Sequence, residues 1–165
     1  MKPNYLTILI TTLCIFFNAC HNSNTAPQLQ LADSLIDKRA DSALCILEKL
    51  SIEEISNKSA KAMYALLLTE ALDKNFKSHR NDSLILIAVD YYKDNSNNKL
   101  KTKAYYYLGR VYQDNKEYIK ATEAYLTALK TASPNQAPIL QIYNNLALCY
   151  ESQEFYLPAI KTYKE

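Results

Sequence analysis

A spaced pattern of tyrosine, leucine and small residues occurs twice in the second half of the chain and constrains its fold most. The first copy reads Tyr105-x-x-Leu108-Gly109-x-x-Tyr112 and continues with Ala121-x-x-x-Tyr125. The second copy reads Tyr143-x-x-Leu146-Ala147-x-x-Tyr150 and continues with Ala159-x-x-x-Tyr163. Spacings of three and four residues place side chains on one face of an α-helix. Each copy therefore predicts two helices joined by a short polar break.

The small residues of the pattern predict where these helices approach each other closely. Gly109 and Ala147 lie on the first helix of each pair, and Ala121 and Ala159 lie on the second. The tyrosines are expected to fill the spaces between pairs while their hydroxyls stay near water. A single helix pair cannot bury its own apolar face, so neighbouring pairs must stack.

This ordered pattern resembles the signature of the tetratricopeptide repeat family, in which an aromatic residue, Leu-Gly, Tyr, Ala and a second aromatic residue follow one another. The resemblance implies an all-α fold, a right-handed α-solenoid of antiparallel helix hairpins. It implies one repeat over residues 101–135 and another, truncated repeat over residues 139–165.

Residues 28–100 are predicted to form degenerate hairpins of the same kind. Lys58–Asp73 is strongly helical, and Asp82–Lys93 is its expected partner, opened by a cap at Asn81 and Asp82. A shorter pair is expected over Gln28–Arg39 and Asp41–Leu50. Ser51-x-x-Glu54 has the spacing of a capping box.

Residues 1–19 have the features of a secretory signal, with Lys2 followed by an apolar stretch from Leu6 to Phe17. This stretch is shorter than the roughly 20 residues that cross a bilayer. The sequence Phe17-Asn18-Ala19-Cys20 resembles the end of a bacterial lipoprotein signal, which implies a lipid on Cys20 and a location in the cell envelope, on the periplasmic or outer-membrane side. Residues 20–27 are then a flexible tether. The alternative is an ordinary cleaved signal with Cys20 left free.

The order of these segments also resembles the N-terminal region of tetratricopeptide lipoproteins and regulators from Bacteroidetes-type bacteria. The residues concerned include ADSLID, KAMYALLLTEALDKN and KAYYYLGRVY. The resemblance implies the sensor part of a signalling regulator, whose membrane helix or output domain would follow Glu165. The sequence ends within an unfinished repeat, so we expect a fragment.

Composition argues against several kinds of chemistry. Gly109 is the only glycine, which excludes a glycine-rich phosphate loop. The net charge of +2 leaves no footprint for nucleic acid. Cys45 and Cys149 lack the spacing of a metal site and are expected to be small packing residues, although a disulfide between them stays open. We expect no cofactor, no metal and no catalytic residue, and hence no enzyme.

The resemblance to the tetratricopeptide repeat family implies that the first helix of each hairpin lines a groove, and the predicted function is the binding of a protein or peptide there. The candidate groove residues share the helix face that the repeat pattern leaves outside the core: Lys103, Tyr106, Arg110, Gln113, Gln141, Asn144, Leu148 and Glu151. Tyr and Arg often anchor interfaces. The alternatives are a solenoid that receives a small ligand or carries an enzyme site, and a structural spacer in an envelope assembly.

Overall fold

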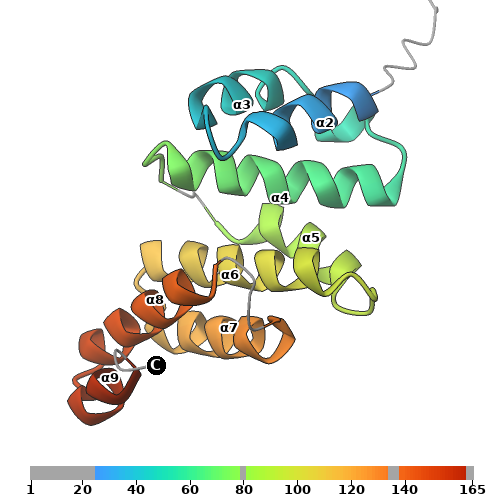
Figure 1. The fold of residues 1–165 in the computed structure, drawn as a ribbon. Helices are drawn as coiled ribbons and strands as arrows, with labels where there is room; N and C mark the ends of the chain where they lie inside the picture. Colours follow the sequence, from blue (N-terminus) through green and yellow to red (C-terminus); the bar gives the residue numbers. More distant parts are fainter. Residues whose placement is uncertain (1–24, 79–80, 134–137, 163–165) are drawn as a thin grey trace, which may run out of the picture.

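The computed structural model describes residues 25–78, 81–133 and 138–162, and the regular secondary structure within them is all helical (Figure 1). It contains eight α-helices and one 3₁₀ helix in this part of the chain. Their bounds are α2 Ala26–Leu35, α3 Ala40–Leu47, η1 Ile52–Glu54, α4 Lys58–Lys74, α5 Ser83–Tyr92, α6 Asn98–Asp114, α7 Tyr118–Thr131, α8 Ile139–Ser152 and α9 Tyr156–Thr162. The all-α prediction is confirmed. No described helix is both long enough and apolar enough to cross a bilayer.

The helices form four hairpins, α2–α3, α4–α5, α6–α7 and α8–α9, which we divide into A helices (α2, α4, α6 and α8) and B helices (α3, α5, α7 and α9). Each A helix packs against the next A helix, from α2 to α4, α6 and α8. Among the described helices no comparable packing joins one B helix to the next. The A helices therefore make the inner row of a curved solenoid, and the B helices make its outer row.

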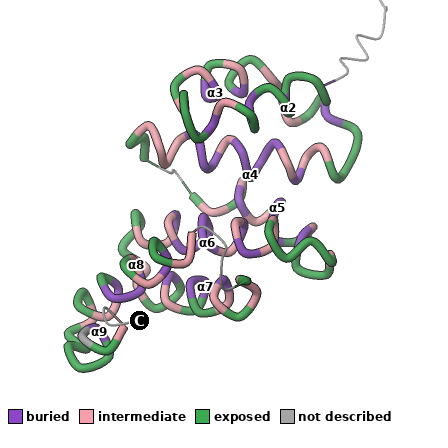
Figure 2. Tube along the Cα trace, viewed as in Figure 1, coloured by how far each residue is buried: buried purple, intermediate pink, exposed green. Residues whose placement is uncertain are grey.

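The core is continuous along the stack because α4 takes part in two apolar clusters. One cluster joins α2, α3 and α4, and the other extends from α4 through α8. Leu84 of α5 packs against both. Figure 2 shows α4 buried or half-buried along most of its length and α9 largely exposed. Each hairpin therefore depends on its neighbours for the burial of its apolar face.

The small residues of the repeat are buried, and Gly109 marks a close contact between the two helices of its hairpin. Gly109 lies against the ring of Tyr125, and a Cβ atom at Gly109 would stand only 2.4 Å from that ring. Ala121, Ala147 and Ala159 are also buried. Among the larger repeat residues, Leu108, Tyr125 and Leu146 are buried. The repeat tyrosines that stay partly exposed are Tyr105, Tyr112, Tyr143 and Tyr150, and Tyr163 lies outside the described residues.

The turn between the two helices has the same unusual geometry in three hairpins. Phe76, Lys116 and Glu154 each adopt a positive φ, of 55°, 62° and 62°. In each turn the next residue donates its backbone N–H to a carbonyl five positions back, as Glu117 does to Tyr112 at 2.8 Å. This is the hydrogen bond of a Schellman helix ending, which usually has glycine at the positive-φ position. The hairpin α4–α5 thus shares a local structure with the two hairpins that carry the full repeat pattern.

The structure corrects two local predictions about helix caps and answers the open question of a disulfide between Cys45 and Cys149. Ser51 makes no capping box with Glu54, because its hydroxyl donates to the carboxylate of Glu53 at 2.5 Å and the segment forms a 3₁₀ turn. The side chain that accepts at the start of α5 is Asn81, which bonds the backbone N–H of Ser83 at 3.1 Å. Cys45 and Cys149 are both free thiols.

We predict that Gly109→Ala lowers the free energy of unfolding by about 1–3 kcal/mol, because the new methyl group forces the Tyr125 ring aside in a filled core. Helix propensity alone would give the opposite sign, since alanine is favoured over glycine by about 1 kcal/mol inside a helix. Urea unfolding followed by circular dichroism measures the difference. A variant more stable than the wild type would show that the close contact does not exist.

We predict that Lys116→Gly and Glu154→Gly each raise the free energy of unfolding by about 0.5–1 kcal/mol, because glycine adopts a positive φ without steric cost. Asn115→Gly is the matched control, because Asn115 precedes Lys116 with a φ of −82° and gains nothing from glycine. Urea unfolding followed by circular dichroism measures these differences too. Equal effects at positions 115 and 116 would contradict the turn geometry.

Candidate functional site

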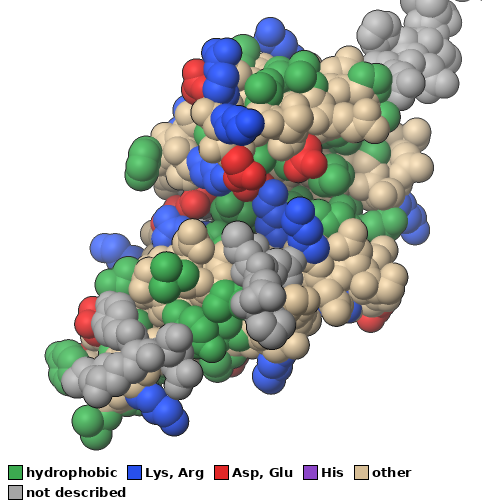
Figure 3. Space-filling view, viewed as in Figure 1, with side chains coloured by type: hydrophobic (Ala, Val, Ile, Leu, Met, Phe, Trp, Pro, Cys, Tyr) green, Lys and Arg blue, Asp and Glu red, His purple; other side chains and the backbone are tan. Residues whose placement is uncertain are grey.

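The inner row of A helices carries most of the charged contacts between hairpins. Acidic and basic side chains gather over the middle of the molecule, where α2, α4 and α6 follow one another (Figure 3). Among the described residues, three ion pairs between hairpins join one A helix, or the residues just after it, to another A helix, and a fourth joins Lys77, just after α4, to Glu48, just after the B helix α3. We therefore treat the surface of the A helices as the candidate site and call it the A face.

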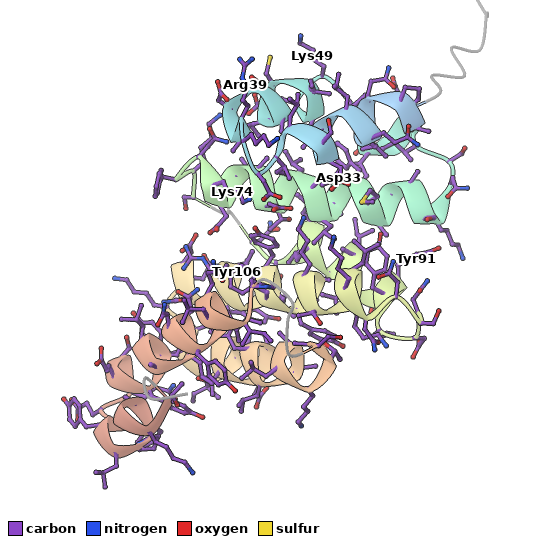
Figure 4. The ribbon with its side chains drawn as sticks, viewed as in Figure 1. Asp33, Arg39, Lys49, Lys74, Tyr91 and Tyr106 are labelled. Atoms are coloured by element: carbon purple, nitrogen blue, oxygen red, sulfur yellow. The ribbon has the colours of Figure 1, made fainter. Side chains whose placement is uncertain are left out.

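The first charged group of the A face connects three hairpins through Glu70. This carboxylate is only 2% exposed, and it forms ion pairs with Lys74 at 3.2 Å and with Lys103 of α6. Its Oε2 atom contacts the Lys103 ammonium but accepts no hydrogen bond of good geometry from the described residues. Lys74 (Figure 4) also contacts Asp37, which follows α2, at 2.5 Å. The chain Asp37–Lys74–Glu70–Lys103 thus extends from the first hairpin to the third.

The pKa values of this group follow from the same contacts. The hydrogen bond from Lys74 lowers the pKa of the Asp37 carboxyl. Burial lowers the pKa of Lys74, but the hydrogen bond to Asp37 and the charge of Glu70 outweigh burial and leave this pKa above its usual value. Both groups are therefore held in their charged forms at neutral pH.

The second charged group centres on Arg110 of α6. Its Nε donates to Asp73 of α4 at 2.9 Å, and its Nη1 donates to the side chain of Gln113 at 3.3 Å. The hydroxyl of Tyr125 donates to the same Gln113 oxygen at 2.7 Å. Burial lowers the pKa of the guanidinium. The charges around it, above all that of Asp73, outweigh burial and leave this pKa above its usual value. Arg110 therefore joins two hairpins and also orders the inside of its own.

Tyr106 lies within the protein rather than on an open surface (Figure 4). Its ring packs edge-on against Tyr107 with centroids 4.9 Å apart, and it lies 6.1 Å from the ring of Tyr125. Its hydroxyl accepts a hydrogen bond from Asn145 of α8 at 3.4 Å. Tyr106 thus connects the third hairpin to the fourth.

The structure divides the predicted groove residues into two sets. The four on α6, which are Lys103, Tyr106, Arg110 and Gln113, make the contacts between helices described above. The four on α8, which are Gln141, Asn144, Leu148 and Glu151, are exposed on one side of that helix. Periodicity identified the inner face of α6 but gave no sign that α4 would cover much of it. The signal in the sequence that could have predicted this contact was the opposite charge of Glu70 and Asp73 on α4 and of Lys103 and Arg110 on α6.

A hollow of about 760 Å³ lies at one end of the A face, between α2, α4 and the segment that precedes α4. Its lining includes Leu29, Gln30 and Asp33 from α2 and Met63 from α4, together with Glu54. Sequence reasoning missed this hollow because part of its wall comes from the irregular residues 55–57. A hollow of this size falls within the range that binds ligands.

The remaining reactive groups are dispersed. No set of His, Cys, Asp and Glu in the described chain has an arrangement that holds a metal ion. Burial raises the pKa of the Cys149 thiol to about 11, and Cys45 is exposed on α3. Cys20, His21 and His79 lie outside the described residues.

Comparisons with known proteins identify the class of fold. No known family model matches the sequence, and no curated protein matches it either. The structure is similar to that of the TPR domain of Arabidopsis FLU, with a TM-score of 0.59 and 19% identity over 66% of this chain and 92% of that one. Two structures of MamA match with TM-scores of 0.55 and 0.56 and identities of 23% and 22%, over 86% and 87% of this chain and 70% and 77% of theirs. The chain therefore has the fold of a tetratricopeptide-type α-solenoid of helix hairpins.

We predict that Glu70→Gln lowers the free energy of unfolding by about 2–3 kcal/mol, because Lys74 and Lys103 lose a buried counter-charge. The loss falls below that of a fully buried pair because both lysines keep some contact with water. Asp90→Asn is the control, since it removes an exposed partner of Lys93 and costs less than about 0.5 kcal/mol. Equal effects of the two substitutions in urea unfolding would contradict a structural role for the Glu70 group.

Proposed function

We propose that this chain is a non-catalytic scaffold that binds a protein or peptide along the A face. The observation that carries the proposal is the direct packing of consecutive A helices, which creates one continuous inner surface across four hairpins. The exposed side chains of α8 and the hollow at the other end lie on this surface. A curved solenoid of this kind presents its inner surface to extended partners.

Charged residues of the A face already pair with one another, which favours recognition of a partner by shape and polar contacts. Glu70, Asp73, Lys103 and Arg110 are already committed to ion pairs between hairpins. What remains open to a partner is the exposed row on α8, with Gln141, Asn144, Leu148 and Glu151, and the lining of the hollow. Amides and a leucine beside one carboxylate suit hydrogen bonds to a peptide backbone together with one apolar contact.

We also propose that the protein is exported and held at a membrane of the cell envelope by a lipid on Cys20. The support comes from the sequence: an apolar segment too short to span a bilayer precedes Ala19 and Cys20. More than one acyl chain would anchor the protein stably, whereas a single chain binds only weakly. An anchored binding surface in the envelope suits the sensor part of a signalling regulator.

The A face is tested by photo-crosslinking in cells that make the full chain. We expect a photoreactive residue at Gln141 or Asn144 to form adducts with one partner protein or peptide. The same group at Glu123 or Lys130, which are exposed on the B helix α7, should form none. Mass spectrometry identifies the adducts. Adducts from α7 with none from α8 would place the binding surface elsewhere and contradict the proposal.

The lipid anchor is tested by Cys20→Ser in the full chain. We expect the wild type to incorporate an alkyne-labelled fatty acid and to sediment with membranes, and we expect the variant to do neither. Cys45→Ser is the control, because Cys45 lies on α3, far along the chain from the signal. A Cys20→Ser variant that still carries the label would refute lipidation at this residue.

A further inference from the structure

The hollow between α2 and α4 differs from the rest of the A face in its charge. Two carboxylates, Asp33 and Glu54, line it, and no lysine or arginine does so. Neither forms an ion pair with a described residue, whereas Asp37, Glu70 and Asp73 each contact a cation. Figure 4 shows Asp33 on the side of α2 that faces α4. The hollow thus carries two negative charges that the described part of the protein does not neutralise.

The floor of the hollow is apolar. Leu29 and Ile55 are almost fully buried at its base, and Ala60 and Met63 of α4 are partly exposed beside them. A surface that combines an apolar floor with carboxylates at its edge matches a side chain with an apolar stem and a positive end. Lysine and arginine have this construction, and they place the stem along apolar surface while the charged end meets a polar group.

One wall of the hollow is an extended piece of backbone. Ile55 and Asn57 have β-type dihedral angles, with φ and ψ of −83° and 105° and of −81° and 126°. Between them, the backbone N–H and C=O of Ser56 form no backbone hydrogen bond within the described chain. Free main-chain groups on an extended segment can pair with the backbone of an extended peptide.

We infer that the hollow binds an extended segment of a partner protein that carries a lysine or arginine. The cationic end lies between Asp33 and Glu54, its stem crosses Leu29 and Met63, and the backbone of the segment pairs with Ser56. The occupant is peptidic, because charge alone would suit any amine, whereas the extended wall adds main-chain recognition. This inference rests on the proposed function and assigns the chemistry of one part of its surface.

Phage display of random dodecapeptides on the full chain tests the inference. Selected clones are counter-screened against the double variant Asp33→Asn/Glu54→Gln. We expect the enriched peptides to share a lysine or arginine and to lose binding to the double variant. An Asp90→Asn variant should bind them like the wild type, since Asp90 is an exposed acid on the B helix α5. Both substituted acids are exposed, so folding is preserved, and circular dichroism checks it.

The strongest peptide is then compared with a copy that has citrulline in place of arginine, or norleucine in place of lysine. Fluorescence anisotropy should show binding about tenfold weaker for the neutral copy to the wild type, and equal binding of both copies to the double variant. Equal binding of both copies to the wild type would overturn the inference.

The outcomes separate this inference from the proposed function. Peptides that bind the double variant as well as the wild type, and lose binding when Gln141 and Asn144 become alanine, would support the A face as a binding surface and refute the role of the hollow. A screen that enriches no peptide on the wild type would count against both.

Discussion

The structure depends on the direct packing of each A helix against the next A helix. Because consecutive A helices pack against one another and no comparable packing joins the described B helices, the stack curves toward the A side. Side chains on the inner surface therefore face neighbouring hairpins at short range, and long charged residues there must find partners. Glu70 and Arg110 meet this requirement by pairing with residues of other hairpins. The surface that gives the fold its curvature is thus also the surface that offers a place for a partner.

Much of the fold could be predicted from the sequence. The spacing of Tyr105, Leu108 and Tyr112 fixes a helix face, and Gly109 marks a close approach that the structure places against Tyr125. The turns were harder, because a helix ending of the Schellman type is usually signalled by glycine. Lys116 and Glu154 stand at those positions, so periodicity located each break without giving its geometry.

The candidate site was less accessible to sequence reasoning. Periodicity placed Tyr106 and Arg110 on one face of α6, but it contains no information about how closely α4 covers that face. Contacts between residues about 37 positions apart, such as Arg110 with Asp73, are visible in a single sequence only as a possible match of charges. The hollow near Asp33 depends on an irregular segment whose path no periodic pattern specifies.

The chain of contacts from Asp37 to Lys103 has a mechanical consequence. Consecutive hairpins share an apolar core, which salt affects little, whereas the contacts from Asp37 to Lys103 are ionic and partly open to water. Added salt therefore weakens the ionic part of the contact between hairpins and leaves the apolar part in place. The electrolyte around the protein thus acts on the ionic connections between the A helices more than on the apolar packing that the hairpins share.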